Sequence, residues 1–437
     1  MTSGAPLSLS ETASALCLVF ILLVPLAAAG LALINAGLGR SRNAAHAMLS
    51  SLAVIAVAAL TYFAIGFSWQ SYAGGTSHML SAQGKLWNWI GAERFFLRGL
   101  AFDGSPASLA ALLGLFSAGL AAMIPLGSGG DRWRLGPCCA SSAILSGWTF
   151  PLFAHWAWGD GWLAGLAQNY GLGRGFIDSG GAAAIQAVGG LTALSITWIL
   201  GPRRGKYTSE GMPAAIPGHN AVFVLFGCFL AWLGWIGLTS AGAILFNGSQ
   251  PGHTPLVAVN LTLAAASSAL AVCLITRSRY GKPDASLCAN GWVAGLVASS
   301  AGAAVSRPAA AVLIGIVGGA LMVYSVEWLE VYLTIDDPGG AISVHALAGL
   351  WGIMAVGLFA AAPDGTSSAG QWLAQFAGVA TLIGFVLPLA YTLNWLLNRL
   401  YPQRVPAEAE RQGLDLHELG AGAYPDFMSH NEDLWQR

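Results

Sequence analysis

The chain has 437 residues, of which 55% are hydrophobic and only 9% are charged, and its mean hydropathy is +0.63. Charged residues make up about a quarter of an ordinary soluble protein, so this composition excludes a soluble globular fold and indicates an all-α polytopic membrane protein. The formal net charge of -1 lacks the basic footprint that nucleic acid requires, and we expect no nucleic-acid partner. The six cysteines show no CxxC or Cys/His spacing, so we expect neither a metal site nor a cofactor.

Apolar runs interrupted by Gly, Pro or charge predict eleven membrane-spanning helices. The first, near residues 13–38, exceeds the ~20 residues that cross a bilayer and follows no basic segment, so we interpret it as a helix and not as a cleaved signal peptide. A tryptophan-containing external loop is expected over residues 69–105. The other ten helices are expected near residues 46–67, 106–127, 138–157, 181–201, 219–246, 255–276, 285–304, 308–329, 341–362 and 370–398.

The distribution of Lys and Arg over the loops predicts the orientation. With the N-terminus outside, fourteen of the 19 basic residues lie on the inside, and the five outside are Lys85, Arg94, Arg98, Arg174 and Arg307. This positive-inside bias supports that orientation. We therefore expect a transmembrane domain over residues 1–400, followed by a cytoplasmic tail over residues 401–437.

Two segments about 160 residues apart match without a gap, DSGGAAAIQAVGG (178–190) and DPGGAISVHALAG (337–349). They open the fifth and tenth predicted helices from opposite sides, which predicts an inverted five-plus-five repeat with the eleventh helix outside it. Transport proteins built in this way hold their site where the repeats meet. Gln186 and His345 occupy matched positions, so symmetry predicts that they approach each other. A histidine that only packs in its helix is the alternative.

Asp178 and Asp337 lie just before the two helix starts, where a carboxylate can accept backbone N–H bonds. We favour this capping role for Asp337, at the cytoplasmic end. Asp178 lies outside, near FAHWAWGDGWL (153–163), and is expected to make the vestibule negative. There Trp158 offers an aromatic face to a small cation. An interfacial tryptophan with no ligand is the alternative.

Longer motifs resemble those of the ammonium transporter (Amt/Mep/Rh) family, on its Amt branch. These are HWAWGDGWL (155–163), GKPD (281–284), ANGWVAGLV (289–297), DDPGGAISVHALAGLWGIMAVGLF (336–359) and the tail segment RVPAEAERQGLDLHELGAGAYP (404–425). The resemblance covers nearly the whole chain. It implies ammonium as the substrate, a homotrimer in the plasma (inner) membrane, and one pore through each eleven-helix subunit. It also implies a tail that packs under the bundle, couples subunits and adjusts binding of a PII-type signal protein.

The family's pathway residues carry over in part. The resemblance assigns Trp158 and Asp178 to the outer site, Trp235 to the tryptophan of helix six, and His345 to the second conduit histidine. Four positions depart from the family: Gln186 replaces the first conduit histidine, Leu113 and Leu238 replace the gate phenylalanines, and Gly242 replaces a serine that contacts the cation. The matched residues of the tail include Arg404, Glu410, Gly413 and Asp415.

These departures predict altered chemistry on one pathway. Leucines keep it apolar but lack the quadrupole that attracts a cation, and glycine lacks a hydroxyl acceptor, so we expect the outer site to bind ammonium weakly. Glutamine cannot take up and pass a proton as imidazole does. The pair of Gln186 and His345 is therefore expected to pass neutral ammonia or to lose discrimination among cations.

Three functions follow from this reading. The first is an ammonium or ammonia transporter, the second is an ammonium sensor with reduced conduction that presents its tail to a signalling partner, and the third is a channel of altered specificity. A tail that is simply a solvated charged segment is the alternative to a regulatory one. The sequence contains no Ser/His/Asp arrangement, P-loop or dinucleotide fingerprint, so we do not expect an enzyme. His46, His155 and His219 lie near helix ends and are expected to be structural.

Overall fold

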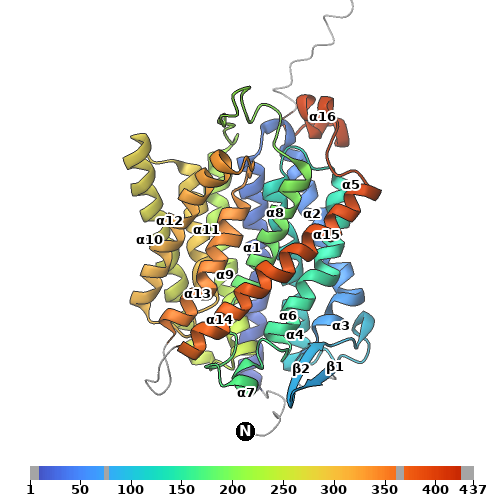
Figure 1. Cartoon of the computed structure of the whole chain (residues 1–437), viewed down its shortest axis with the longest axis vertical. Coiled ribbons are helices and arrows are strands. Elements are labelled where there is room, and N and C mark those ends of the chain that lie inside the picture. The colour runs from blue at the N-terminus through green and yellow to red at the C-terminus, as the bar shows by residue number, and fades with distance from the viewer. Residues whose placement is uncertain (1–8, 73–77, 361–368, 425–437) are drawn as a thin grey trace, which may run out of the picture.

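The computed structural model describes residues 9–72, 78–360 and 369–424, in which long helices lie side by side and form one bundle (Figure 1). The tail residues 425–437, included in the predicted cytoplasmic segment, lie outside the described part. The first half of the bundle contains α1 (Glu11–Leu38), α2 (Ala44–Thr61), a π-helical turn (Tyr62–Gly66), α3 (Phe67–Gln70), α4 (Pro106–Gly129), α5 (Leu135–Ile144), a π-helical turn (Leu145–Thr149), α6 (Phe150–Trp158), a π-helical turn (Ala182–Ala187) and α8 (Val188–Leu200).

The second half begins with α9 and ends with the last long helix of the bundle. It contains α9 (Ala221–Asn247), α10 (Thr254–Tyr280), α11 (Ala285–Ser300), α12 (Pro308–Tyr332), a π-helical turn (Ile342–Leu347), α13 (Ala348–Phe359), α14 (Ala369–Thr381), a π-helical turn (Leu382–Val386) and α15 (Leu387–Leu400). Shorter elements are β1 (His78–Ala82), β2 (Lys85–Ile90), α7 (Leu166–Tyr170), three 3-10 turns (Ser41–Asn43, Phe95–Leu97, Pro251–His253), and, in the tail, α16 (Ala407–Gln412) and a π-helical turn (Asp415–Leu419).

Each of the eleven predicted segments is helical, with ends displaced by up to four residues. Within the described ranges, nine helical segments are long and apolar enough to cross a membrane. The other two predicted spans are residues 135–158, which join α5 and α6, and α11, whose 16 residues fall short of the usual ~20. The structure is that of an all-α, multi-pass membrane protein, and membrane crossing by these two segments stays a prediction.

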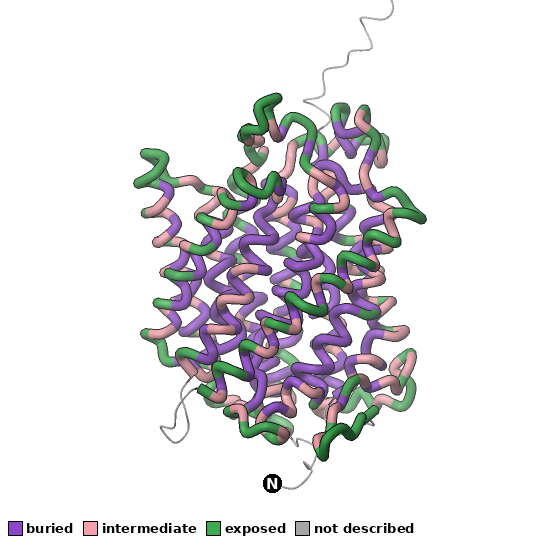
Figure 2. The backbone as a smooth tube through the Cα atoms, viewed as in Figure 1, coloured by how far each residue is buried: buried purple, intermediate pink, exposed green. Residues whose placement is uncertain are grey.

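The pattern of buried and exposed residues is the one expected for a helix bundle surrounded by lipid. The central turns of the helices are buried and the outward-facing turns are exposed (Figure 2). The exposed positions on the outer helices are apolar, including Leu52, Val222 and Leu270, which are 66, 73 and 65% exposed. Inside, glycines bring backbones into direct contact: a Cβ on Gly30 of α1 would lie 2.5 Å from the carbonyl oxygen of Gly227 of α9. Small residues at helix contacts are typical of packing in membranes.

The duplicated segments form an inverted pair. The first copy follows α7, which lies at the same end of the bundle as the β1–β2 hairpin, whereas the second copy begins at the opposite end, where Asp337 accepts a hydrogen bond from Ser128 in the last turn of α4 (Figure 1). Their contacts are reciprocal, because Gly190 packs against Ala346 and the matched Gly349 packs against Ala187. Both copies therefore enter the centre of the bundle from opposite ends and cross there through small residues.

The expected external loop contains a hairpin that the sequence analysis did not predict. Strands β1 and β2 are antiparallel, and β2 lies against the segment that follows α6. The side-chain amide of Asn88 lies 2.9 Å from Nε2 of His155, within hydrogen-bond distance, and the backbone carbonyl oxygen of Asn88 accepts a hydrogen bond of 3.1 Å from the backbone N–H of Trp162. His155 thus joins the hairpin to α6, which agrees with the structural role expected for it.

Candidate functional site

The two matched polar residues meet where the repeats cross. Nδ1 of His345 lies 2.7 Å from Oε1 of Gln186, and both side chains are buried. An amide oxygen only accepts, so His345 donates from Nδ1, and its Nε2 remains an acceptor. The amide nitrogen of Gln186 has no hydrogen-bond partner among the described atoms. The pair therefore offers one acceptor and one donor group to a small polar solute.

Both residues lie in π-helical turns, Ala182–Ala187 and Ile342–Leu347, each preceded by a glycine with positive φ. A π-helical turn is a local widening of an α-helix that occurs often at functional positions. Gly181 and Gly340 have φ values of 76° and 70°, a conformation that favours glycine. The GGA sequence common to both copies therefore sets the turn that aims Gln186 and His345 inward.

Asp178 and Asp337 make similar contacts at the two helix starts. Oδ2 of Asp178 accepts hydrogen bonds from the backbone N–H groups of Ala183 and Ala184, and the Asp337 carboxylate accepts them from Ala341 and Ile342. Both therefore stabilise a helix N-terminus. Burial raises the pKa of Asp178 to about 6, and the hydrogen bonds from the backbone oppose that rise. A further role for Asp178 in attracting cations stays a prediction.

Trp158 ends α6, and its ring is covered by another aromatic ring. Phe246, in the last turn of α9, stacks on it with ring centroids 4.5 Å apart and ring planes at 4°. The indole N–H of Trp158 donates to the carbonyl oxygen of Asp178 over 2.7 Å, which fixes the plane of the ring. The sequence analysis assigned Trp158 and Asp178 to one site, and the structure brings them together, but Phe246 was missed.

The other residues assigned to the pathway are all buried. Trp235 joins α9 to α11 by donating a 3.1 Å hydrogen bond from its indole nitrogen to Ser300. Leu113 in α4 and Leu238 in α9 are each 1% exposed and belong to the main hydrophobic core. They keep the interior apolar, and their role as gate residues stays a prediction.

Gly242 faces the backbone of the first repeat. A Cβ on this glycine would lie 1.9 Å from the carbonyl oxygen of Ser179, well inside any normal contact. We expect Gly242→Ser, which would install the family's serine, to lower the yield and melting temperature of the protein and not to improve cation binding. Fluorescence-detected size exclusion after heating measures this. Gly252→Ser is the control, since a Cβ there meets nothing within 4 Å, and equal melting temperatures for the two variants would contradict the expectation.

A cavity of about 720 Å³ opens beside the stacked rings, at the end of the bundle predicted to face outside. Phe246, Arg174, Arg307 and His253 are among its lining residues, and none of the described residues that line it is Asp or Glu. Such a vestibule does not concentrate cations by charge, because its two arginines oppose them. The expectation of a negative vestibule therefore finds no support in these lining residues.

Comparison with known proteins identifies the family. The model of the Ammonium Transporter Family matches residues 15–424. This chain belongs to the ammonium transporter family. It is 35% identical to Ammonium transporter Amt2 of Archaeoglobus fulgidus, over 93% of this chain and 86% of that one, and 29% identical to Ammonium transporter 1 member 3 of Solanum lycopersicum, over 97 and 95%. Among solved structures, a Sensor Amt Protein matches with a TM-score of 0.83 at 28% identity, covering 93% of this chain and 97% of that one. The Mep2 protein of Candida albicans matches at 25% identity with a TM-score of 0.76, covering 95 and 90%.

In this member of the ammonium transporter family the tail packs against the end of the bundle opposite the hairpin. Glu410 is buried and accepts hydrogen bonds from the backbone N–H of Arg204 and from the Arg404 guanidinium, which also donates to the carbonyl oxygen of Leu200. Gly413 has φ 110°, and a Cβ there would lie 2.7 Å from the carbonyl oxygen of Arg42. These contacts do not describe a merely solvated segment.

Two acidic residues of the tail hold the starts of neighbouring helices. The Asp415 carboxylate accepts hydrogen bonds from the backbone N–H groups of Ala45 and His46, in the first turn of α2. Glu418 accepts one from Nε2 of His46 over 2.8 Å and one from the N–H of Leu135, the first residue of α5. Although burial raises the pKa of Glu418, these partners outweigh it and hold the pKa below its usual value. The sequence analysis named Asp415 and expected His46 to be structural, but it did not predict the contact between His46 and Glu418.

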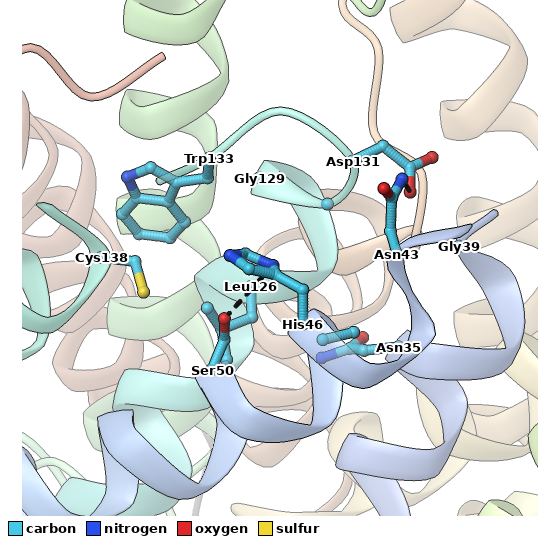
Figure 3. Close-up of a pocket in the computed structure, with 12 residues that line it drawn as sticks. Asn35, Gly39, Asn43, His46, Ser50, Leu126, Gly129, Asp131, Trp133 and Cys138 are labelled. Carbon is cyan, nitrogen blue, oxygen red and sulfur yellow. Dashed lines mark hydrogen bonds between the residues drawn. The ribbon is translucent and has the colours of Figure 1, made fainter. Parts of the chain in front are cut away.

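The same histidine borders a small cavity under the tail. His46, Ser50, Asn35 and Cys138 line a space of about 40 Å³ between α1, α2, α4 and α5 (Figure 3). The second ring nitrogen of His46 points to the Ser50 hydroxyl at 3.5 Å (Figure 3). His46 therefore connects the tail to the interior of the helix bundle, which is the structural role expected for it.

A buried ionic network joins the two repeats below the tail. Arg203 donates two hydrogen bonds to the Asp336 carboxylate, each 2.9 Å long, and one of 3.0 Å to Asp131. All three side chains are at most 4% exposed. Asp131 follows α4 and Arg203 follows α8, both in the first half, whereas Asp336 follows α12 in the second half, so the network joins the two halves.

Proposed function

We propose that this chain is a transmembrane ammonium transporter that receives ammonium on the outside and passes ammonia between its two repeats. The single observation that supports this most is the buried hydrogen bond between Gln186 and His345 at the crossing of the repeats. The helical segments that meet there, residues 182–200 and 342–359, contain no Asp, Glu, Lys or Arg. An ion in this region would lose its hydration without gaining a countercharge, whereas neutral ammonia loses far less.

Each of the site residues has its own role in this transport. Trp158, with Asp178 behind it, belongs to the outer site, Leu113 and Leu238 keep the pathway apolar, and the Gln186 and His345 pair supplies hydrogen bonds in the middle. Ammonium gives up its proton to water on the outer side before ammonia passes the apolar part, so the proton stays outside. The N–H groups of ammonia are donors for Nε2 of His345, and its lone pair is an acceptor for the amide of Gln186.

Assembly and regulation belong to the same proposal. We infer a homotrimer in the cell membrane, with the tail of residues 401–437 in the cytoplasm. A regulatory role of the tail is supported by its docked residues Arg404, Glu410, Gly413 and Asp415. In this role, a PII-type signal protein at the cytoplasmic face would bind according to the position of the tail.

A second candidate function is ammonium sensing with little conduction. It is favoured by one observation, the glutamine at position 186 where the first conduit histidine is expected, and the similarity to the Sensor Amt Protein is compatible with it. In that case ammonium occupies the outer site, and the tail carries the response to a partner.

Proteoliposomes that contain the purified protein separate these functions. A pulse of external ammonium is applied while current and internal pH are recorded together. Transport of neutral ammonia predicts a rise in internal pH above that of protein-free liposomes, with little current. A transporter of charged ammonium predicts a saturating current. If neither the current nor the internal pH changes, transport is rejected. Ammonium-dependent binding of a tail partner would then support sensing.

A further inference from the structure

The stack of Phe246 on Trp158 closes the face that a cation would use. Atoms in contact lie about 3.5 to 4.0 Å apart, and the two ring centroids are only 4.5 Å apart with nearly parallel planes. No ammonium ion fits between them. The other ring packed on Trp158 is Phe150, in an edge contact at 6.3 Å. Ammonium therefore reaches the covered face of Trp158 only if Phe246 moves.

The position of Phe246 leaves it room to move. It lies one residue before the end of α9, which stops at Asn247 and is followed by Gly248 with φ 61°. The backbone of this turn is held by Tyr72, whose hydroxyl donates to the carbonyl oxygen of Leu245 over 3.0 Å. The ring itself is only partly buried and lines the external cavity of about 720 Å³. A rotation of the side chain thus carries the ring into open space while the helix stays in place.

The surroundings of this ring lack other means of attracting a cation at the expected gate positions and in the vestibule. The two expected gate positions are leucines, Leu113 and Leu238, which have no face to offer a cation. The vestibule has arginines and no carboxylate among its described lining residues, so charge does not draw ammonium in. Aromatic stacking and cation–π attraction are of similar strength, so an ammonium ion can replace one ring in contact with the other.

We propose that Phe246 is the entrance gate and size filter of the outer site. At rest it covers Trp158, and it turns into the vestibule to admit one ammonium ion, which then lies on the indole face with the phenyl ring beside it. A methylated ammonium needs a wider opening and is admitted less often. This inference rests on the proposed function, because it assigns a gate to the outer site of that pathway.

Uptake of ammonium and methylammonium into proteoliposomes tests the gate. Phe246→Ala is expected to raise the ratio of methylammonium to ammonium uptake by about threefold or more, comparable to the loss of one stacked aromatic pair. Phe229→Ala is the matched control, since Phe229 lies on the same helix and is 59% exposed on its outer surface. An unchanged ratio in Phe246→Ala, or an equal rise in the control, overturns the proposal.

Binding measurements keep the gate testable if the wild type does not transport. The thermal stability of detergent-solubilised protein is measured against methylammonium concentration. Because no ring has to be displaced in Phe246→Ala, its half-saturating concentration is expected to be about threefold lower than that of the wild type. If the wild-type protein binds methylammonium but does not transport it, the proposed transport is rejected and the proposed gate is retained. Equal half-saturating concentrations in wild type and variant reject the gate itself.

Discussion

Gln186→His is expected to increase the current evoked by ammonium by about tenfold or more, since a positioned group that takes up and releases protons commonly contributes at least that much to a rate. In the wild type, the Gln186 amide accepts a hydrogen bond from His345 but cannot carry a proton onward. A histidine in its place provides two neighbouring imidazoles, through which a proton can pass separately from ammonia. Electrophysiology on a solid-supported membrane, with internal pH recorded in parallel, measures both movements.

Gln186→Leu is the matched control for this substitution. It has a similar size but removes the acceptor of the His345 N–H, so it should reduce ammonia flux and produce no current. Equal currents in Gln186→His and wild type would show that the glutamine does not limit proton movement. A current in Gln186→Leu as large as in Gln186→His would assign the change to altered packing.

Arg203→Ala is expected to destabilise the folded protein by about 3 to 5 kcal/mol, the usual cost of leaving a buried charge without its partner. Here two carboxylates, Asp131 and Asp336, would lose their countercharge at once. Heating followed by fluorescence-detected size exclusion measures the loss in detergent. Lys282→Ala, at an exposed position on the same side of the bundle, should melt as the wild type does. A melting temperature of Arg203→Ala within one degree or so of the wild type would show that water replaces the arginine.

The same network predicts how stability depends on pH. Burial alone raises the pKa of Asp336, but hydrogen bonds and charge from Arg203 outweigh it, so the pKa lies below its usual value. A depressed carboxyl pKa contributes stability above the unfolded pKa, near 3.9, and this stability is lost as pH falls through the folded value. We expect no change from Asp336 between pH 5 and 8 and a loss below pH 4. Melting curves of Asp336→Asn should lack that acidic loss, and an identical acidic loss in variant and wild type would assign it to other groups.

Much of the fold follows from the sequence, because each helix carries its own apolar run and lipid allows few alternatives for the backbone. The contact between Gln186 and His345 was predicted from the duplication alone, since symmetry relates the two positions without knowledge of the helices between them. Helix ends depend also on contacts with other segments. The predicted span at residues 285–304 stops at Ser300, where the backbone carbonyl accepts a hydrogen bond from Gly180 of the other repeat.

The remaining features depend on contacts between distant segments. Phe246 carries no signal in the sequence, because an aromatic residue at the end of an apolar helix is ordinary, and only the fold places it on Trp158. The sequence suggests that Gly242 is a serine site that has lost its hydroxyl, whereas in the structure the Ser179 backbone occupies the space that a side chain would need. The hairpin of residues 78–90 was missed because its strands are short and do not alternate regularly.

The Asp415 cap on α2 has a consequence for any event that removes the tail. The first turn of a helix has N–H groups without partners in the helix itself, and here the tail supplies the acceptors for two of them. Undocking would therefore leave α2 with a frayed beginning, next to the cavity that His46 borders. Truncation of the tail therefore does more than remove a regulatory segment. It also removes the hydrogen-bond acceptors that complete the first turn of α2. Detachment of the tail and loosening of α2 should occur as one cooperative event.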